Sequence, residues 1–151
     1  MKVLIVCHGN ICRSPMAEGI LKFKLEKNRK KHIQVESAGF EPYHKGDEPD
    51  NRAKATMKKH HIDISNKRAN LFKVSDFDDF DHIYFMDDNN LNYIKSFARN
   101  EFDLAKTDYI LNTTNPGKNY SVPDPYYGGN EGFEMVYKLL DSACEKLCKT
   151  L

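Results

Sequence analysis

The sequence predicts an α/β fold in which helices cover both faces of a parallel sheet. Short apolar, β-branched segments alternate with segments whose apolar residues recur at helical spacing, and stretches rich in glycine and proline separate them. Strands that alternate with helices in this way run parallel, because each connecting helix packs back onto the sheet. There is no internal repeat and no linker-like stretch, so residues 1–151 are predicted to form one domain.

Each predicted element rests on a local pattern. Residues 2–6 are apolar and β-branched and lead into a glycine-containing loop, which predicts a short buried strand. A helix is expected directly after that loop, because Ser14 suits the N-cap and Pro15 suits the first helical position. Further strands are predicted over 33–37, 82–86 and 109–111, further helices over 52–60, 89–97 and from Glu131 onward, and loops over 40–50 and 112–129.

The composition is typical of a soluble globular protein, with 40% hydrophobic and 30% charged residues. The formal net charge is only +1, so we expect neither nucleic acid nor a membrane surface as a partner. No segment has the pattern of a secretion signal or the length of a membrane span. The four cysteines are therefore expected to be reduced thiols, and the protein to be cytoplasmic.

The strongest functional signal is the stretch from Cys7 to Ser14, called here the Cys loop, at the end of the first predicted strand. Five residues separate Cys7 from Arg13, enough for the chain to curl once around a phosphate-sized anion. Gly9 allows successive backbone N–H groups to point inward, the following helix adds its N-terminal amides, and Arg13 adds a planar fork of donors. The predicted phosphate-binding positions between and after these residues are His8, Gly9, Asn10, Ile11, Cys12 and Ser14.

The same surroundings favour the thiolate of Cys7, which is the nucleophilic form of cysteine. A thiolate aimed at the phosphorus of a bound phosphoryl group predicts catalysis through a cysteinyl-phosphate. By itself Cys7 would be interpreted as a small buried residue at the end of a strand. Its position before Gly9, Arg13 and Ser14 makes the nucleophile the favoured interpretation.

Asp124 is the candidate general acid. It lies between Pro123 and Pro125, which stiffen the chain around the carboxyl group, and two tyrosines follow. An aryl or alkyl oxygen leaves more readily when it receives a proton, and a positioned carboxylic acid can supply one. An Asp-Pro pair alone usually indicates a turn. Together with the Cys loop, it predicts an acid for the leaving group.

These two motifs and their positions closely resemble those of the low-molecular-weight protein tyrosine phosphatases. The resemblance covers essentially the whole chain and is carried by residues 6–18, 36–39, 80–87 and 124–127. It implies a single-domain three-layer sandwich with a four-stranded parallel sheet in the order 2-1-3-4. It further implies no metal or cofactor, and Cys7, Arg13 and Asp124 as nucleophile, phosphate clamp and general acid. The expected substrates are tyrosine-phosphorylated proteins and small aryl phosphates, and the protein is expected to be a monomer.

The resemblance also assigns secondary roles. The residues expected to shape the Cys loop are Asn10, Ser14, Ser37 and Asn66, and those expected to line the substrate pocket are His8, Ile11, Tyr43, Tyr126 and Tyr127. Ser14 is expected either to stabilise the Cys7 thiolate or only to cap the helix. Cys12 is expected to form a reversible disulfide with Cys7, or else to be a plain loop residue. Two positions depart from the family: His8 replaces an apolar residue, and Asn66 replaces a histidine.

Three alternatives stay open. An arsenate reductase built on the same loop would need further cysteines, and residues 72–92 contain none. A protein-arginine phosphatase would have threonine in place of Ile11. A catalytically silent phosphoprotein-binding module would be expected if Cys7, Arg13 or Asp124 were missing, and all are present.

Overall fold

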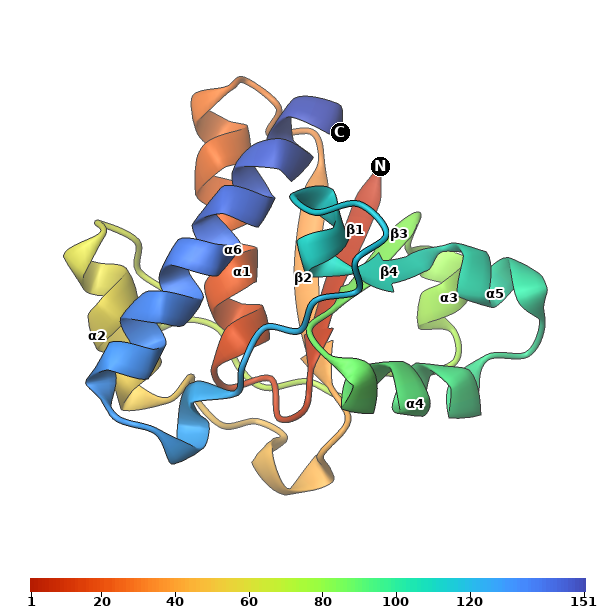
Figure 1. The fold of residues 1–151 in the computed structure, drawn as a ribbon, viewed down its shortest axis with the longest axis horizontal. Coiled ribbons are helices and arrows are strands. Elements are labelled where there is room, and N and C mark those ends of the chain that lie inside the picture. Colours follow the sequence, from red (N-terminus) through yellow and green to blue (C-terminus); the bar gives the residue numbers. More distant parts are fainter.

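The computed structural model describes the backbone of residues 1–151 and every side chain except that of Tyr127. Its strands form one parallel sheet in the order β2-β1-β3-β4, as predicted (Figure 1). The strands are β1 (Lys2–Cys7), β2 (Gln34–Gly39), β3 (His82–Phe85) and β4 (Thr107–Tyr109). The register places Cys7 opposite Gly39 and Val6 opposite Phe85, so the carboxyl ends of the three longest strands meet at one edge.

Helices cover both faces of this sheet (Figure 1). One face carries α1 (Arg13–Lys27), α2 (Asn51–Lys59) and α6 (Asn130–Thr150). The other face carries α3 (Asp76–Asp79), α4 (Asp88–Phe97) and α5 (Glu101–Ala105). Three short 3-10 helices lie in the connections, η1 (Pro42–His44), η2 (Ile110–Thr113) and η3 (Pro125–Tyr127).

The central strand β1 divides the core into two parts. Val3 and Ile5 pack with α1, α2 and α6, whereas Leu4 and Val6 pack with the helices on the opposite face. All four side chains are at most 2% exposed. A strand covered on both faces has apolar residues on both, which explains the continuous apolar run in the sequence.

Several expectations about local structure were wrong in detail. Helix α1 begins at Arg13 with Cys12 at the N-cap, so Ser14 lies inside the helix and does not cap it. The last strand ends at Tyr109, and residues 110–113 turn into η2 instead of extending the strand. The short helices α3 and α5 were not predicted, because four or five residues are too few to show an apolar period. No helix in the described part of the chain is long and apolar enough to span a bilayer.

Candidate active site

The Cys loop joins the end of β1 to the start of α1 at the carboxyl edge of the sheet (Figure 1). Its backbone is held by the end of β2: the His8 carbonyl accepts hydrogen bonds from the N–H groups of Phe40 and Glu41 at 2.8 and 3.0 Å. Asn10 adopts a positive φ of 56°, which Asn tolerates better than most residues. The loop is therefore fixed before any ligand binds.

Gly39 allows this close approach between β2 and the Cys loop. A Cβ atom at position 39 would lie 2.8 Å from the backbone nitrogen of Asn10 and 2.9 Å from the carbonyl oxygen of His8. Because both contacts are backbone atoms, only a shift of the loop would relieve them. Gly39 is thus required by the shape of the loop and not by a turn of its own.

Gly39→Ala is therefore expected to lower kcat/KM for p-nitrophenyl phosphate by about 10- to 100-fold, since a small misplacement of catalytic groups costs that much. The matched control is Gly129→Ala, because no atom lies within 4 Å of a Cβ placed there. Steady-state kinetics and thermal melts on both variants check the prediction. Unchanged activity in Gly39→Ala would show that the loop has room to move.

The Cys7 thiol lies against Ser14. Cys7 Sγ and Ser14 Oγ are 3.0 Å apart, and the Ser14 backbone N–H points at the same sulfur at 3.4 Å. Both side chains are buried. The Ser14 hydroxyl is thus placed to donate to a thiolate, which is the first of the two roles that the sequence left open.

A buried chain of hydrogen bonds extends from Ser14 away from the pocket. The Asn10 amide donates to Ser14 Oγ at 2.8 Å and to Ser37 Oγ at 2.9 Å. Ser37 Oγ in turn donates to a Glu18 carboxylate oxygen at 2.5 Å. Because Asn10 gives its protons to both hydroxyls, each is left to donate onward, Ser14 to the sulfur and Ser37 to Glu18.

The far end of this network differs from the prediction. Asn66 is exposed and makes no hydrogen bond to Asn10 among the described residues. The Asn10 carbonyl oxygen instead accepts from the backbone N–H of Asn70 at 2.9 Å. Lys67 closes the network, with Nζ 2.8 Å from the Ser37 carbonyl and 3.3 Å from Glu18. A lysine next to Asn66 therefore supplies the positive charge at this point.

Arg13 is buried under the pocket floor, 2% exposed. Its Nη1 donates to Asp87 at 2.6 Å and to the Val122 carbonyl at 2.9 Å. Burial disfavours the charged guanidinium, but the negative charges of Cys7 and Asp87 outweigh it and raise the pKa of Arg13. Arg13 is therefore a fixed cation whose Nη2 makes no hydrogen bond to a described residue and faces the pocket.

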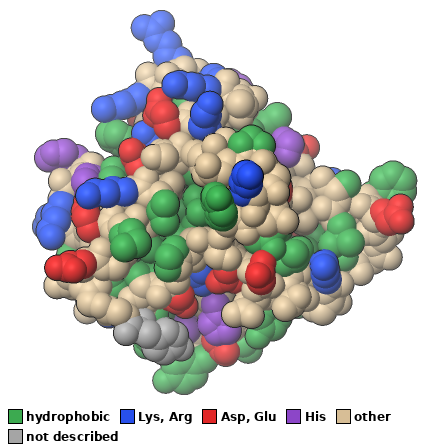
Figure 2. All heavy atoms as spheres, in the orientation of Figure 1, with side chains coloured by type: hydrophobic (Ala, Val, Ile, Leu, Met, Phe, Trp, Pro, Cys, Tyr) green, Lys and Arg blue, Asp and Glu red, His purple; other side chains and the backbone are tan. Residues whose placement is uncertain are grey.

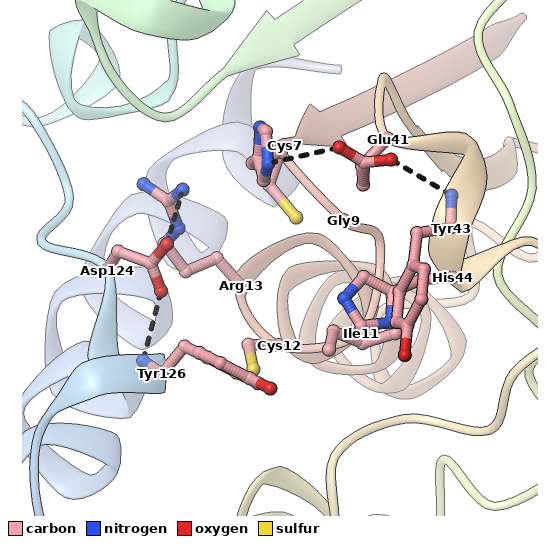
Figure 3. A pocket seen from close by; sticks show the side chains of 11 residues that line it. Cys7, Gly9, Ile11, Cys12, Arg13, Glu41, Tyr43, His44, Asp124 and Tyr126 are labelled. Carbon is pink, nitrogen blue, oxygen red and sulfur yellow. Dashed lines mark hydrogen bonds and ion pairs between the residues drawn. The ribbon is translucent and has the colours of Figure 1, made fainter.

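Asp124 lies beside this cation at the pocket wall. Its Oδ2 is 3.6 Å from Arg13 Nη2, and Oδ1 accepts the Tyr126 backbone N–H at 3.0 Å, so the carboxylate caps η3 (Figure 3). Its side chain keeps 35% of its surface exposed. The Asp-Pro turn and the candidate acid thus coincide, because the turn holds the carboxyl group at the pocket.

These groups surround one pocket of about 410 Å³, called here the catalytic pocket. Arg13 and Asp124 lie on one side of the Cys7 sulfur, and the residues of η1 lie on the other (Figure 3). The lining residues are Cys7, His8, Gly9, Ile11, Cys12, Arg13, Glu41, Tyr43, His44, Asp124 and Tyr126. Thiol, guanidinium and carboxyl group therefore meet in one cavity, although Asp124 is more than one hundred residues from Cys7 in the sequence.

Comparisons with known proteins identify this arrangement. A sequence model described as low molecular weight phosphotyrosine protein phosphatase matches residues 2–151. The chain belongs to this family. It is thus a phosphoric monoester hydrolase of the low molecular weight protein-tyrosine phosphatase type.

Individual relatives are similar over nearly their full length. Low molecular weight phosphotyrosine protein phosphatase 1 of Drosophila melanogaster is 37% identical, over 98% of this chain and 95% of that protein. A solved protein tyrosine phosphatase of Entamoeba histolytica superposes with a TM-score of 0.90 at 34% identity, covering 97% of this chain and 94% of that one. A solved Drosophila arginine phosphatase superposes with a TM-score of 0.91 at 33% identity, covering 99% and 97%.

The mouth of the phosphatase pocket combines aromatic, histidine and acidic side chains. The Tyr43 side chain is 83% exposed, whereas Ile11 is only 9% exposed and forms part of the pocket wall. His8 Nε2 lies 3.9 Å from Glu41, so an acidic group accompanies the unusual histidine at the rim. Hydrophobic and histidine side chains gather at the lower edge of the molecule, where η1 lies (Figure 2). The predicted pocket residue Tyr127 has a side chain outside the described residues.

Cys12 shares the pocket wall with Cys7, and both are free thiols. Burial, reinforced by the nearby Asp50 carboxylate, raises the pKa of the Cys12 thiol far above its ordinary value. Cys12 is therefore protonated, which distinguishes it from a nucleophile. Its redox role stays a prediction.

The segment that carries Asp124 is tied to α2 by Arg52. This guanidinium donates to the carbonyls of Tyr126 and Gly128 at 2.9 and 3.0 Å and lies 5.6 Å from the Tyr126 ring centroid. Asp50 holds Arg52 in turn, through bonds of 3.0 and 3.1 Å. Burial opposes ionisation of Asp50, but the hydrogen bonds from Arg52 outweigh it and lower the Asp50 pKa.

Sequence reasoning did not single out several residues of this site. They are Glu18, Glu41, His44, Arg52, Lys67 and Asp87. Asp87 had a usable signal, because it lies two residues after the end of β3, at the edge where ligands bind. Arg52 and Lys67 had none, since the carbonyls that Arg52 binds at the Asp124 segment, and both the carbonyl and the acid that Lys67 contacts, are far away in the sequence.

Proposed function

We propose that this phosphatase hydrolyses phosphotyrosine in proteins, and small aryl phosphates, through a cysteinyl-phosphate intermediate. One observation supports the proposal above all. The Cys7 sulfur, which is hydrogen-bonded to Ser14, shares a single pocket with the fixed cation of Arg13 and the carboxyl group of Asp124. These three groups supply nucleophile, anion clamp and proton donor.

In the first step the Cys7 thiolate attacks phosphorus and the bond from phosphorus to the aryl oxygen breaks. The leaving oxygen takes the proton of Asp124. Backbone N–H groups of the Cys loop and Nη2 of Arg13 stabilise the charge on the remaining phosphoryl oxygens. The products of this step are the phenol and a phosphate covalently bound to Cys7.

In the second step a water molecule attacks phosphorus and gives a proton to the Asp124 carboxylate. The sulfur–phosphorus bond breaks, and the electron pair returns to Cys7 as a thiolate. The Ser14 hydroxyl, 3.0 Å from the sulfur, stabilises this leaving group by donating a hydrogen bond. Inorganic phosphate leaves, and both catalytic groups regain their starting protonation states.

The walls of the pocket support an aromatic phosphoester. Ile11 and Tyr126 line it, and Tyr43 stands exposed at its mouth. Flat and apolar side chains of this kind pack on the ring of a tyrosine. We assign Tyr127 to the same wall from its place in the sequence. The further members of the proposed site are the Cys loop residues from His8 to Ser14 and the network residue Ser37.

The arginine phosphatase among the solved relatives makes phosphoarginine the substrate to test against. We expect the wild-type protein to hydrolyse a phosphotyrosine peptide at least about 100-fold faster, in kcat/KM, than phosphoserine or phosphoarginine peptides of the same sequence, a preference of about 2.7 kcal/mol. Phosphate release measured on the three peptides checks this. Equal or faster release from phosphoarginine would overturn the substrate assignment but not the chemistry of Cys7.

We place the protein in the cytoplasm, where the reducing environment keeps a catalytic thiol active. Its four cysteines are free thiols, in agreement with such a compartment. We also propose that residues 1–151 act as a single phosphatase domain and as a monomer.

A further inference from the structure

A second hollow adjoins the catalytic pocket and shares one wall with it. His8 lines both cavities. The hollow, called here the α4 groove, has a volume of about 470 Å³, comparable with the 410 Å³ of the catalytic pocket. Its lining residues are His8, Asn89, Asn92, Tyr93 and Ser96. A substrate that fills the catalytic pocket can therefore continue past His8 into a neighbouring site.

One face of α4 supplies most of this groove. Asn89, Asn92, Tyr93 and Ser96 follow the spacing i, i+3, i+4 and i+7, which places them on one side of a helix. All four are exposed. Exposed Asn and Tyr side chains alone would not indicate a site, but these four share one hollow with His8, which also lines the catalytic pocket.

The groove is held rigidly to the catalytic groups. Asp87 caps α4 through the Asn90 N–H at 2.9 Å, and its other oxygen accepts from Arg13 at 2.6 Å. The Tyr93 ring stacks on Phe40 at 4.9 Å between centroids, with 9° between the planes. Phe40 in turn donates its N–H to the His8 carbonyl in the Cys loop. The position of α4 relative to Cys7 is thus fixed from two sides.

The chemistry of the lining points to a polypeptide backbone. Asn89 and Asn92 each offer an amide that both donates and accepts, and neither side chain is hydrogen-bonded to a described residue. None of the described residues that line the groove is a lysine, an arginine or an acid, so the groove offers little to a second phosphate or to a lipid headgroup. Amide pairs suit the alternating N–H and C=O groups of an extended chain.

We propose that the α4 groove binds the main chain of the substrate protein beside the phosphotyrosine that occupies the catalytic pocket. The inference rests on the proposed function and extends it, because it makes the natural substrate a polypeptide rather than a free aryl phosphate. Affinity then comes from main-chain hydrogen bonds with Asn89 and Asn92 and from packing on the Tyr93 ring. Side-chain preference of the substrate should accordingly be weak on this side.

The test compares three substrates on the full chain: a phosphotyrosine peptide of about ten residues, free phosphotyrosine, and p-nitrophenyl phosphate. The double variant Asn89→Ala/Asn92→Ala is expected to lower kcat/KM for the peptide about 10-fold, the loss expected from two hydrogen bonds, with under about 2-fold change for the small esters. Alanine has the highest helix propensity, and both substituted positions are exposed on α4, so the fold should persist.

Asn115→Ala is the matched control. Asn115 is also an exposed asparagine whose side chain makes no hydrogen bond to a described residue, and it lines a separate hollow against α6. It should leave all three substrates unchanged. An equal loss for peptide and small esters in the double variant would show a general disturbance of α4 and overturn the proposal. No loss for the peptide would overturn it too.

The outcomes separate this inference from the function beneath it. If the wild-type protein hydrolyses none of the three esters, the proposed function fails. If the wild-type protein hydrolyses peptide and small esters, and the double variant does so with unchanged ratios, only the α4 groove is excluded.

Discussion

Replacement of Cys7 by serine should reduce turnover of p-nitrophenyl phosphate by about 10⁴-fold or more while phosphate still binds, since removal of a covalent nucleophile costs on this order. A serine hydroxyl ionises far less readily than a cysteine thiol, and its neighbour Ser14 is a hydrogen-bond donor and not a base. The phosphate contacts come from Arg13 and the Cys loop backbone, and neither depends on sulfur. Catalysis and binding should therefore separate.

Steady-state kinetics measure the first quantity and calorimetric titration with inorganic phosphate the second. Cys148→Ser is the matched control, because Cys148 is also a buried free thiol but lies near the C-terminal end of α6, away from the Cys loop (Figure 1). The Cys148→Ser variant should hydrolyse p-nitrophenyl phosphate at the rate of the wild-type protein. Turnover by Cys7→Ser within about 10-fold of the wild-type protein would end the covalent mechanism, whatever the phosphate titration showed.

The sequence predicted the parts of this site that lie close together along the chain. Cys7 and Arg13 occur on one loop, so their spacing alone indicated that both face one anion. The sheet order was predicted through the family resemblance, and the alternation of apolar segments predicted its parallel strands. Asp124 was found because it stands between two prolines, although its contact with Arg13 depends on the whole fold.

Contacts that depend on backbone donors were not predictable in the same way. The Asn10 carbonyl oxygen accepts an N–H from Asn70, and a backbone N–H looks the same at every residue except proline. The sequence indicated the side chain of Asn66 instead, which makes no hydrogen bond to Asn10 among the described residues. Similarly, Ser14 has the chemistry of an N-cap, but the helix begins two residues earlier than that role requires, and this leaves its hydroxyl to Cys7.

Substitution of Asp124 by asparagine should slow esters with poor leaving groups far more than those with good ones. Asparagine keeps an oxygen that can accept the Tyr126 N–H, so η3 and the pocket wall should persist. What is lost is the proton for the departing oxygen, which is worth about 10²- to 10⁴-fold in rate. Phosphotyrosine, whose phenol has an ordinary pKa of about 10, needs that proton more than p-nitrophenyl phosphate does.

The measurement is kcat for a series of substituted phenyl phosphates, plotted against the acidity of the released phenol. The slope should be steeper for Asp124→Asn than for the wild-type protein. Asp47→Asn removes the same charge near the pocket mouth, where Asp47 lies 3.2 Å from His44, and should leave the slope unchanged. Replacement of the carboxyl group 3.6 Å from Arg13 by a neutral amide should not weaken binding of a phosphate dianion, since it adds no negative charge to the pocket. An equal fall in kcat for every ester would therefore contradict the acid role and indicate that Asp124 only holds the wall in place.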